Sequence, residues 1–137
     1  MIETYSKNVS VLSGSRIPFN NINLEKGTST IKQGTGSIQL NNCGVYKVCV
    51  TAVATADEAG VVSIQLEKDN VLQPQAVSSY TAADTTSLFT LSFTTLVQVP
   101  RNNCRSNCCI APTVIDVNNA GVGATFETVD IVVDKIC

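Results

Sequence analysis

The clearest pattern in the chain is the alternation of apolar and polar side chains over residues 44–56, GVYKVCVTAVATA. Such alternation places an apolar row on one face of an extended segment, which is typical of a β-strand. The opposite face also carries Val45 and Val53 and is therefore half apolar. A strand that is apolar on both faces needs cover on both. We expect the second sheet of the same domain on one face and a second copy of the chain on the other.

Further segments of the chain alternate in the same way. Residues 87–99 predict a second long strand, in which the odd-numbered positions are mostly apolar. Residues 60–72 predict a hairpin that turns at an Asp-Asn pair and returns at residues 76–80. Pro74 indicates that the return strand lies at a sheet edge. Other strands are predicted at residues 28–33, 37–41, 110–117 and 124–136.

These patterns together define the fold class. About eight to ten short strands with turns between them, and no amphipathic helix, predict an all-β antiparallel sandwich or barrel. A length of 137 residues fits a single domain. We expect the domain to cover residues 17–137, with residues 1–16 as a segment that leads into it or as a tail.

Charge and hydropathy exclude several classes of partner. Hydrophobic residues make up 44% of the chain and charged residues 15%, which describes an ordered, weakly charged domain. The net charge is −2 and the basic residues are scattered, so we expect neither nucleic acid nor insertion into a membrane. No segment reaches the roughly 18 apolar residues of a membrane span. The N-terminus lacks signal-peptide features, so we expect either a chain made inside a cell or a mature or excised fragment.

The chain offers little catalytic chemistry. Histidine is absent, which removes the commonest general base and metal ligand. Asp57 and Glu58 lie in a predicted turn and read as a solvated surface rather than as a catalytic pair. The oxygens of Asp116, Asn118 and Asn119 could hold calcium, although a hydrogen-bonded turn is the simpler interpretation. We predict no enzyme activity, no cofactor and no metal.

The order of the segments resembles that of tumour-necrosis-factor-like jelly rolls. More closely, it resembles the globular heads of complement-type and bacterial collagen-like proteins, in which a Pro-Phe-Asn segment precedes two short strands, a Gly-x-Tyr and a long inner strand. The matching residues here are Pro18-Phe19-Asn20, Ile31, Ile38 and Gly44-Val45-Tyr46. Residues 61–73, 87–99 and 124–136 resemble the hairpin, the strand after it and the terminal strand, so the resemblance covers residues 16–136.

The resemblance implies an antiparallel jelly-roll sandwich of ten strands that forms a homotrimer. Members are heads of fibres, spore-surface filaments, virion appendages and secreted ligands. This chain has no collagen-like Gly-x-y stem, which favours a bacteriophage capsid decoration or fibre-head protein on the virion surface. The alternative is the head of a bacterial cell-surface or spore filament. Expected partners are a capsid or fibre protein neighbour, with a host-surface glycan or protein as a further candidate.

A trimer needs an interface, and two segments that are apolar on both faces, residues 45–53 and 126–136, are expected to supply it. The interface candidates in these segments are Val45, Val53, Phe126 and Val132.

Six cysteines raise the question of disulfide bonds. In the implied topology, five of them lie at one pole of the sandwich: Cys43, Cys104, Cys108, Cys109 and Cys137. Cys49 lies about 20 Å from that pole at roughly 3.3 Å per residue and should be unpaired. Disulfides, reduced thiols and a soft-metal site all stay open for the pole. If the thiols oxidise, we expect Cys43 to pair with Cys137, and Cys104 to pair with one of the two cysteines that follow it.

Overall fold

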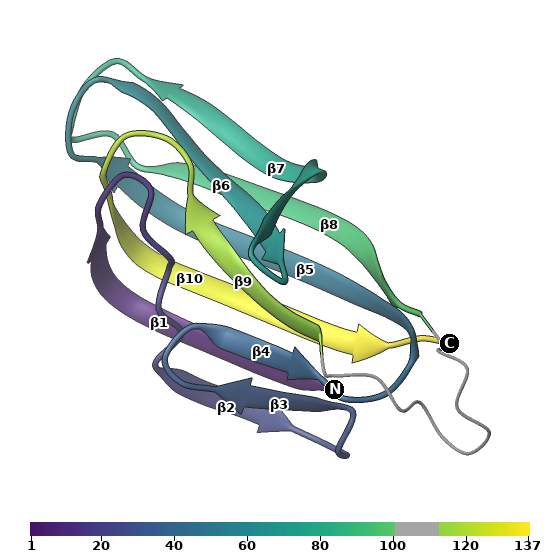
Figure 1. Ribbon diagram of the computed structural model, residues 1–137. Helices are drawn as coiled ribbons and strands as arrows, with labels where there is room; N and C mark the ends of the chain where they lie inside the picture. Colours follow the sequence, from purple (N-terminus) through teal and green to yellow (C-terminus); the bar gives the residue numbers. More distant parts are fainter. Residues whose placement is uncertain (101–112) are drawn as a thin grey trace.

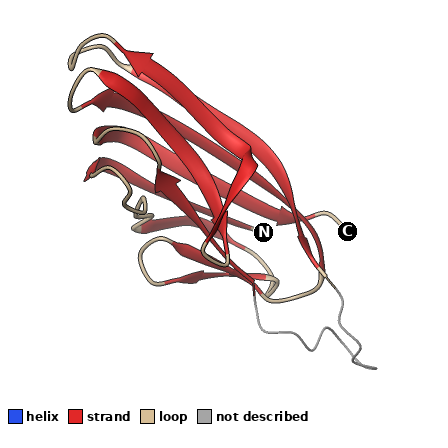
Figure 2. Cartoon of the chain, turned by 45° about the horizontal axis from the view of Figure 1, so that its top comes forward, coloured by secondary structure: helices blue, strands red, loops and turns tan. Residues whose placement is uncertain are grey.

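The computed structural model describes residues 1–100 and 113–137 as two stacked antiparallel sheets of five strands each (Figure 1). In spatial order, sheet A contains β2 (Asn21–Glu25), β1 (Ile2–Val11), β10 (Ala124–Lys135), β5 (Gly44–Ala56) and β8 (Phe89–Val99). Sheet B contains β3 (Thr30–Gln33), β4 (Ser37–Leu40), β9 (Thr113–Asn119), β6 (Gly60–Lys68) and β7 (Val71–Ala82). Strands and loops account for all of the described residues (Figure 2).

The two long strands with the strongest alternation are confirmed. β5 has the bounds predicted from the sequence and lies between β10 and β8. Its predicted inner row is at most 1% exposed: Tyr46, Val48, Val50, Ala52 and Ala54. In β8, every second residue from Phe89 to Val99 is buried. The all-β antiparallel fold class is therefore confirmed.

The predicted hairpin joins β6 to β7 and turns at Asp69 and Asn70, whose φ angles are 50° and 67°. Aspartate and asparagine adopt this left-handed conformation more readily than most residues. β7 is longer than the return strand predicted at residues 76–80. It is an edge strand of sheet B, as Pro74 indicated, because proline cannot donate a ladder hydrogen bond.

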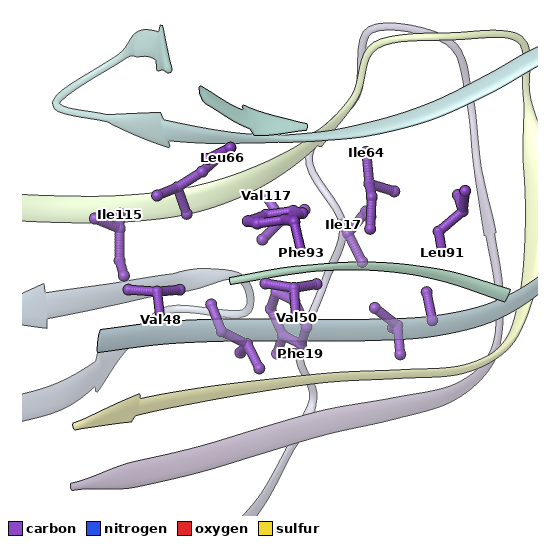
Figure 3. Packing of buried hydrophobic residues seen from close by; sticks show 14 of the residues in the cluster. Ile17, Phe19, Val48, Val50, Ile64, Leu66, Leu91, Phe93, Ile115 and Val117 are labelled. Atoms are coloured by element: carbon purple, nitrogen blue, oxygen red, sulfur yellow. The ribbon is translucent and has the colours of Figure 1, made fainter. Parts of the chain in front are cut away.

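The hydrophobic core lies between the sheets (Figure 3). Side chains of sheet B face side chains of sheet A across the sandwich, among them Ile64, Leu66, Ile115 and Val117 on one side and Val48, Val50, Leu91 and Phe93 on the other. The segment between β1 and β2 adds Ile17 and Phe19, which are 0% and 1% exposed. The turn between β3 and β4 packs on this segment, since a Cβ on Gly36 would lie 2.9 Å from the carbonyl oxygen of Ile17.

The N-terminal segment differs from its expectation as a lead-in or tail. Residues 2–11 form β1, which lies between β2 and β10 and is integral to sheet A. The strand was obscured in the sequence because its buried row contains the polar residues Thr4 and Ser6 next to Ile2. The alternation also shifts at Asn8, whose φ angle is 53°.

The short strand β2 was not predicted. All five of its residues, Asn21–Glu25, are exposed, and it lies at the edge of sheet A. An edge strand without a buried row leaves no alternation in the sequence, so pattern analysis has nothing to detect.

Candidate subunit interface

The first candidate surface is the outer face of sheet A, which is turned away from the core. Three of the four interface candidates lie on it and are partly exposed: Val45, Val53 and Val132. Cross-strand register places Val132 opposite Cys49, and Val53 opposite Thr128. The side chains of β8 on this face are all exposed, and Leu96 is 57% exposed. The outer face therefore presents separate valines and a leucine among polar side chains.

Phe126, the fourth candidate, lies in the core and is 0% exposed, so its prediction as an interface residue is wrong. The register between β10 and β5 shifts between Phe126 and Thr128. Such a β-bulge changes which face the alternating side chains occupy. As a result, Phe126 shares the core face with Val129 and Ile131, whereas Val132 lies on the outer face.

Two carboxyl groups meet on the same outer face. Glu3 of β1 is opposite Val132, and Asp130 of β10 is opposite Tyr5, so the acids occupy diagonal positions on neighbouring strands. They hydrogen-bond to each other, and the Asn23 side-chain amide donates a hydrogen bond to Glu3. The pattern analysis missed this pair because Glu3 lies in the segment taken as a lead-in or tail.

The two members of this carboxyl pair have different proton affinities. The hydrogen bond with Asp130 and the one from Asn23 lower the pKa of Glu3. Burial is the largest cause that raises the pKa of Asp130, to about 7, and the hydrogen bond and charge of Glu3 add to it. Below about pH 7 the pair therefore shares one proton, which resides mainly on Asp130.

A second carboxyl pair, on sheet B, has a cation beside it. Glu67 of β6 and Asp116 of β9 are 8% and 2% exposed. The Arg16 guanidinium lies 3.4 Å from Glu67 Oε2 and 3.7 Å from Asp116 Oδ2. The Ser37 hydroxyl donates to Asp116 over 2.5 Å, and the Asn118 amide donates to Glu67 over 2.6 Å. Burial raises the pKa of Asp116, while the Ser37 hydrogen bond and the Arg16 charge oppose that rise.

The oxygens considered for calcium at residues 116–119 do not converge on one point. The Asn119 side chain lies on the core side of β9, where its Nδ2 donates to Val122 O over 2.9 Å and its Oδ1 accepts from a backbone N–H of the same turn. Asp116 lies on the opposite side. The geometry supports the hydrogen-bonded turn. Within residues 1–100 and 113–137, no three or more His, Cys, Asp or Glu side chains are arranged to hold a metal.

The second candidate surface is the edge where β7 and β8 meet, which we call the β7–β8 edge (Figure 1). The Ser92 N–H of β8 donates to the Ser78 hydroxyl of β7 over 3.2 Å, and the rings of Tyr80 and Phe89 stack with centroids 4.5 Å apart. Neither strand contains a charged residue. Several large apolar side chains of these strands are more than two-fifths exposed: Val71, Leu72, Val77, Tyr80 and Leu96.

The absence of charge at the β7–β8 edge distinguishes it from most exposed edges. Edge strands of proteins that stay monomeric usually carry charges, which prevent another chain from pairing there. An uncharged edge with exposed apolar side chains is typical of a surface that a partner covers.

The cysteines at the end of the sandwich are placed partly as expected. Cys137 lies beside the start of β5, since its carbonyl oxygen accepts from Val45 N–H over 3.3 Å. Gly44 has no side chain to obstruct this approach, and a Cβ there would lie 2.3 Å from the same oxygen. Cys43 and Cys137 are free thiols in this structure. The disulfide between them that we expect on oxidation stays a prediction. Cys49 is also a free thiol.

The other three predicted disulfide candidates, Cys104, Cys108 and Cys109, lie outside the described residues. Among the residues that are described, no helix has the length and apolarity that crossing a membrane requires.

No family model and no curated protein matches this sequence. Solved structures match nearly all of it. The globular domain of the zebrafish complement 1qA protein has a TM-score of 0.68 and 10% identity, over 99% of this chain and 96% of that one. The Eiger TNF of S. frugiperda has a TM-score of 0.70 and 13% identity, over 99% and 92%. The PRD1 vertex protein P5 has a TM-score of 0.61 and 17% identity, over 99% and 96%.

These likenesses identify the fold as the tumour-necrosis-factor-like jelly roll, which confirms the resemblance seen in the sequence. A TNF, a complement globular domain and a phage vertex protein share the architecture. Because one fold serves several roles, the surfaces of this chain must carry the functional argument.

Proposed function

We propose that this chain is a non-enzymatic structural head that forms a homotrimer and acts as a bacteriophage capsid decoration or fibre-head protein on the virion surface. The observation that carries the proposal is the uncharged β7–β8 edge on a chain whose outer face of sheet A also presents partly exposed apolar side chains, among them Val45, Val53 and Val132. The likeness to the PRD1 vertex protein P5 supports the virion location, and a capsid or fibre protein is then the neighbour.

Two unlike surfaces on one chain favour a head-to-tail contact. When such a contact is repeated by rotation, it closes into a ring, whereas a two-fold dimer joins identical surfaces. In the proposed trimer, each outer face of sheet A receives the β7–β8 edge of the next copy. Val45, Val53 and Val132 then lie against the apolar side chains of that edge.

The second candidate function is the globular head of a bacterial cell-surface or spore filament that binds a host-surface glycan or protein. The likeness to the complement 1qA globular domain favours it. Detection of the chain by mass spectrometry in purified virus particles would support the virion role. A chain found only on cells or spores would support the filament role instead.

Assembly is tested by light scattering at micromolar concentration. We expect the mass of three chains for the wild type and of one chain for Val53→Asp or Val77→Asp, because the new carboxylate would be buried without a cation. Ile31→Asp is the matched control, because Ile31 is 40% exposed on β3, at the other edge of sheet B, and should stay trimeric. A single-chain mass for the wild type would contradict the proposal.

A mixture of the two variants tests the head-to-tail geometry. Val53→Asp keeps a usable edge and Val77→Asp keeps a usable face, so the mixture should form pairs of chains but no trimer. If instead Val77→Asp alone dimerises through its intact outer face, the contact joins identical surfaces and the proposed ring is wrong.

A further inference from the structure

We infer that the outer face of sheet A contains a proton-controlled switch for assembly: the Glu3–Asp130 carboxyl pair must share a proton for the β7–β8 edge of the next copy to dock. The inference rests on the proposed trimer and specifies how its interface responds to pH.

The first argument is position. β10 is the middle strand of sheet A, and Asp130 lies near the middle of β10. Glu3 is directly opposite Val132, an interface candidate. Any chain that covers this valine also removes water from the carboxyl pair.

The second argument is that neither carboxyl group of the pair forms an ion pair within the described residues. The cross-strand neighbours of Asp130 are Tyr5 and Thr51, and those of Glu3 are Val132 and Leu24, so none of the four is a lysine or an arginine. Lys47 is opposite Asp134. Lys7 is opposite Thr128 and therefore diagonal to Asp130, as Glu3 is, but among the described residues only Arg16 forms ion pairs with carboxylates, so Lys7 and Asp130 are not an ion pair. The titratable or charged side chains on the outer face around the pair are Tyr5, Lys7, Lys47, Cys49, Glu127 and Asp134, with Glu25 on β2 beside Ile2.

The two strands of the incoming edge supply no cation themselves, although Lys68 lies beside them at one end of the edge. β7 and β8 contain no charged side chain, and β8 adds none to the outer face. Lys68 precedes β7, and its ammonium group donates to the Gln98 carbonyl oxygen over 2.8 Å. Two ionised carboxylates under this edge would repel each other in a poorly solvated place, whereas a carboxyl that donates to a carboxylate is stable there.

The direction of the pH dependence follows from linkage. Asp130 in the uncovered chain already has a pKa raised to about 7 by burial and by Glu3. Covering the pair raises its proton affinity further, so assembly takes up protons above about pH 7. Trimer stability is therefore complete below that pH and falls as the pH rises through it, by roughly tenfold per subunit for each pH unit.

Sedimentation equilibrium of the full chain at about pH 6 and about pH 9 tests the inference. We expect a tighter trimer at the lower pH. Asp130→Asn keeps an uncharged hydrogen-bonding group opposite Glu3 and should assemble equally at both. Asp134→Asn is the matched control: it removes one carboxylate from the same face and should keep the pH dependence of the wild type. Glu3→Gln removes the same repulsion from the other strand and should also flatten the dependence.

A wild-type trimer of equal stability at both pH values would overturn the inference and leave the proposed trimer intact. Unchanged pH dependence in both Asp130→Asn and Glu3→Gln would overturn it as well. A single-chain mass at both pH values would overturn the trimer itself, and the switch with it.

Discussion

The carboxyl pairs on the outer faces of the two sheets have different surroundings. On sheet B, Glu67 and Asp116 have the Arg16 guanidinium within 3.4 and 3.7 Å, together with hydroxyl and amide donors. On sheet A, Glu3 and Asp130 have each other and Asn23. A buried carboxyl pair with a cation beside it has part of its negative charge balanced within one chain. Without an ion pair to a cation, the Glu3–Asp130 pair depends on a shared proton and on the chain that covers the outer face of sheet A. This dependence is expected of a subunit interface.

The comparison of the two sheets requires that residues are assigned correctly to the outer face of sheet A. A substitution of Phe126 tests this assignment and has the largest expected effect on stability. Phe126→Ala should lower the free energy of unfolding by about 3–5 kcal/mol, because it leaves a cavity in the core. Val132→Ala, on the other side of the same strand, should change it by no more than about 1 kcal/mol and weaken assembly instead. Urea unfolding of both variants in the Val53→Asp background measures this, and equal losses would contradict the face assignment.

The strands that could be predicted are those in which apolar, buried side chains alternate with polar, exposed ones along the sequence. β5 and β8 alternate without a break, and the two-sided composition of β5 also pointed to assembly. The bulge after Phe126 could not be predicted, because a β-bulge is set by pairing with β5 and not by local composition.

The two carboxyl pairs could not be predicted from the sequence pattern, for a different reason. Glu3 and Asp130 are far apart in the sequence and meet only through the pairing of β1 with β10. Arg16 reaches Glu67 and Asp116 from a loop, so neither periodicity nor spacing joins the three. The neutrality of residues 71–82 and 89–99 was visible in the sequence, but it became informative only once both were seen to form one edge.

Removing the cation from sheet B should make its carboxyl pair resemble that of sheet A. Arg16→Met is expected to destabilise the chain by about 2–3 kcal/mol near neutral pH, less than for a fully buried pair because Arg16 is half exposed. The pKa of Asp116, already raised by burial, should rise further without Arg16. A raised carboxyl pKa means that stability is lost as the pH rises, so the deficit should shrink in acid.

Urea unfolding of Arg16→Met at about pH 4.5 and about pH 7.5 measures this effect, with Arg16→Lys as the variant that keeps a charge. A deficit that is the same at both pH values would show that Arg16 acts through packing and not through its charge, and the contrast between the two sheets would lose its electrostatic basis.

The smallest expected effect is that of Asp130 on the stability of a single chain. The pKa of Asp130 is raised from 3.8 to about 7, so the folded chain holds a proton that the unfolded chain releases between these values. Stability from this group is therefore complete below about pH 4 and is lost as the pH rises to about 7. Solvent screening at a half-exposed site limits the loss to about 1 kcal/mol.

Asp130→Asn in the Val77→Asp background, which leaves the outer face of sheet A unchanged, should remove that part of the pH dependence and leave the chain slightly more stable above pH 7. Urea unfolding at a series of pH values between about 4 and 8 measures it, with Asp134→Asn as the control. Because the background is monomeric, a flat profile in Asp130→Asn assigns the titration to the carboxyl pair alone. If the free energy of unfolding of Asp130→Asn still falls as the pH rises, Asp130 is an ordinary surface carboxylate. The outer face of sheet A would then need neither a proton nor a partner to be stable.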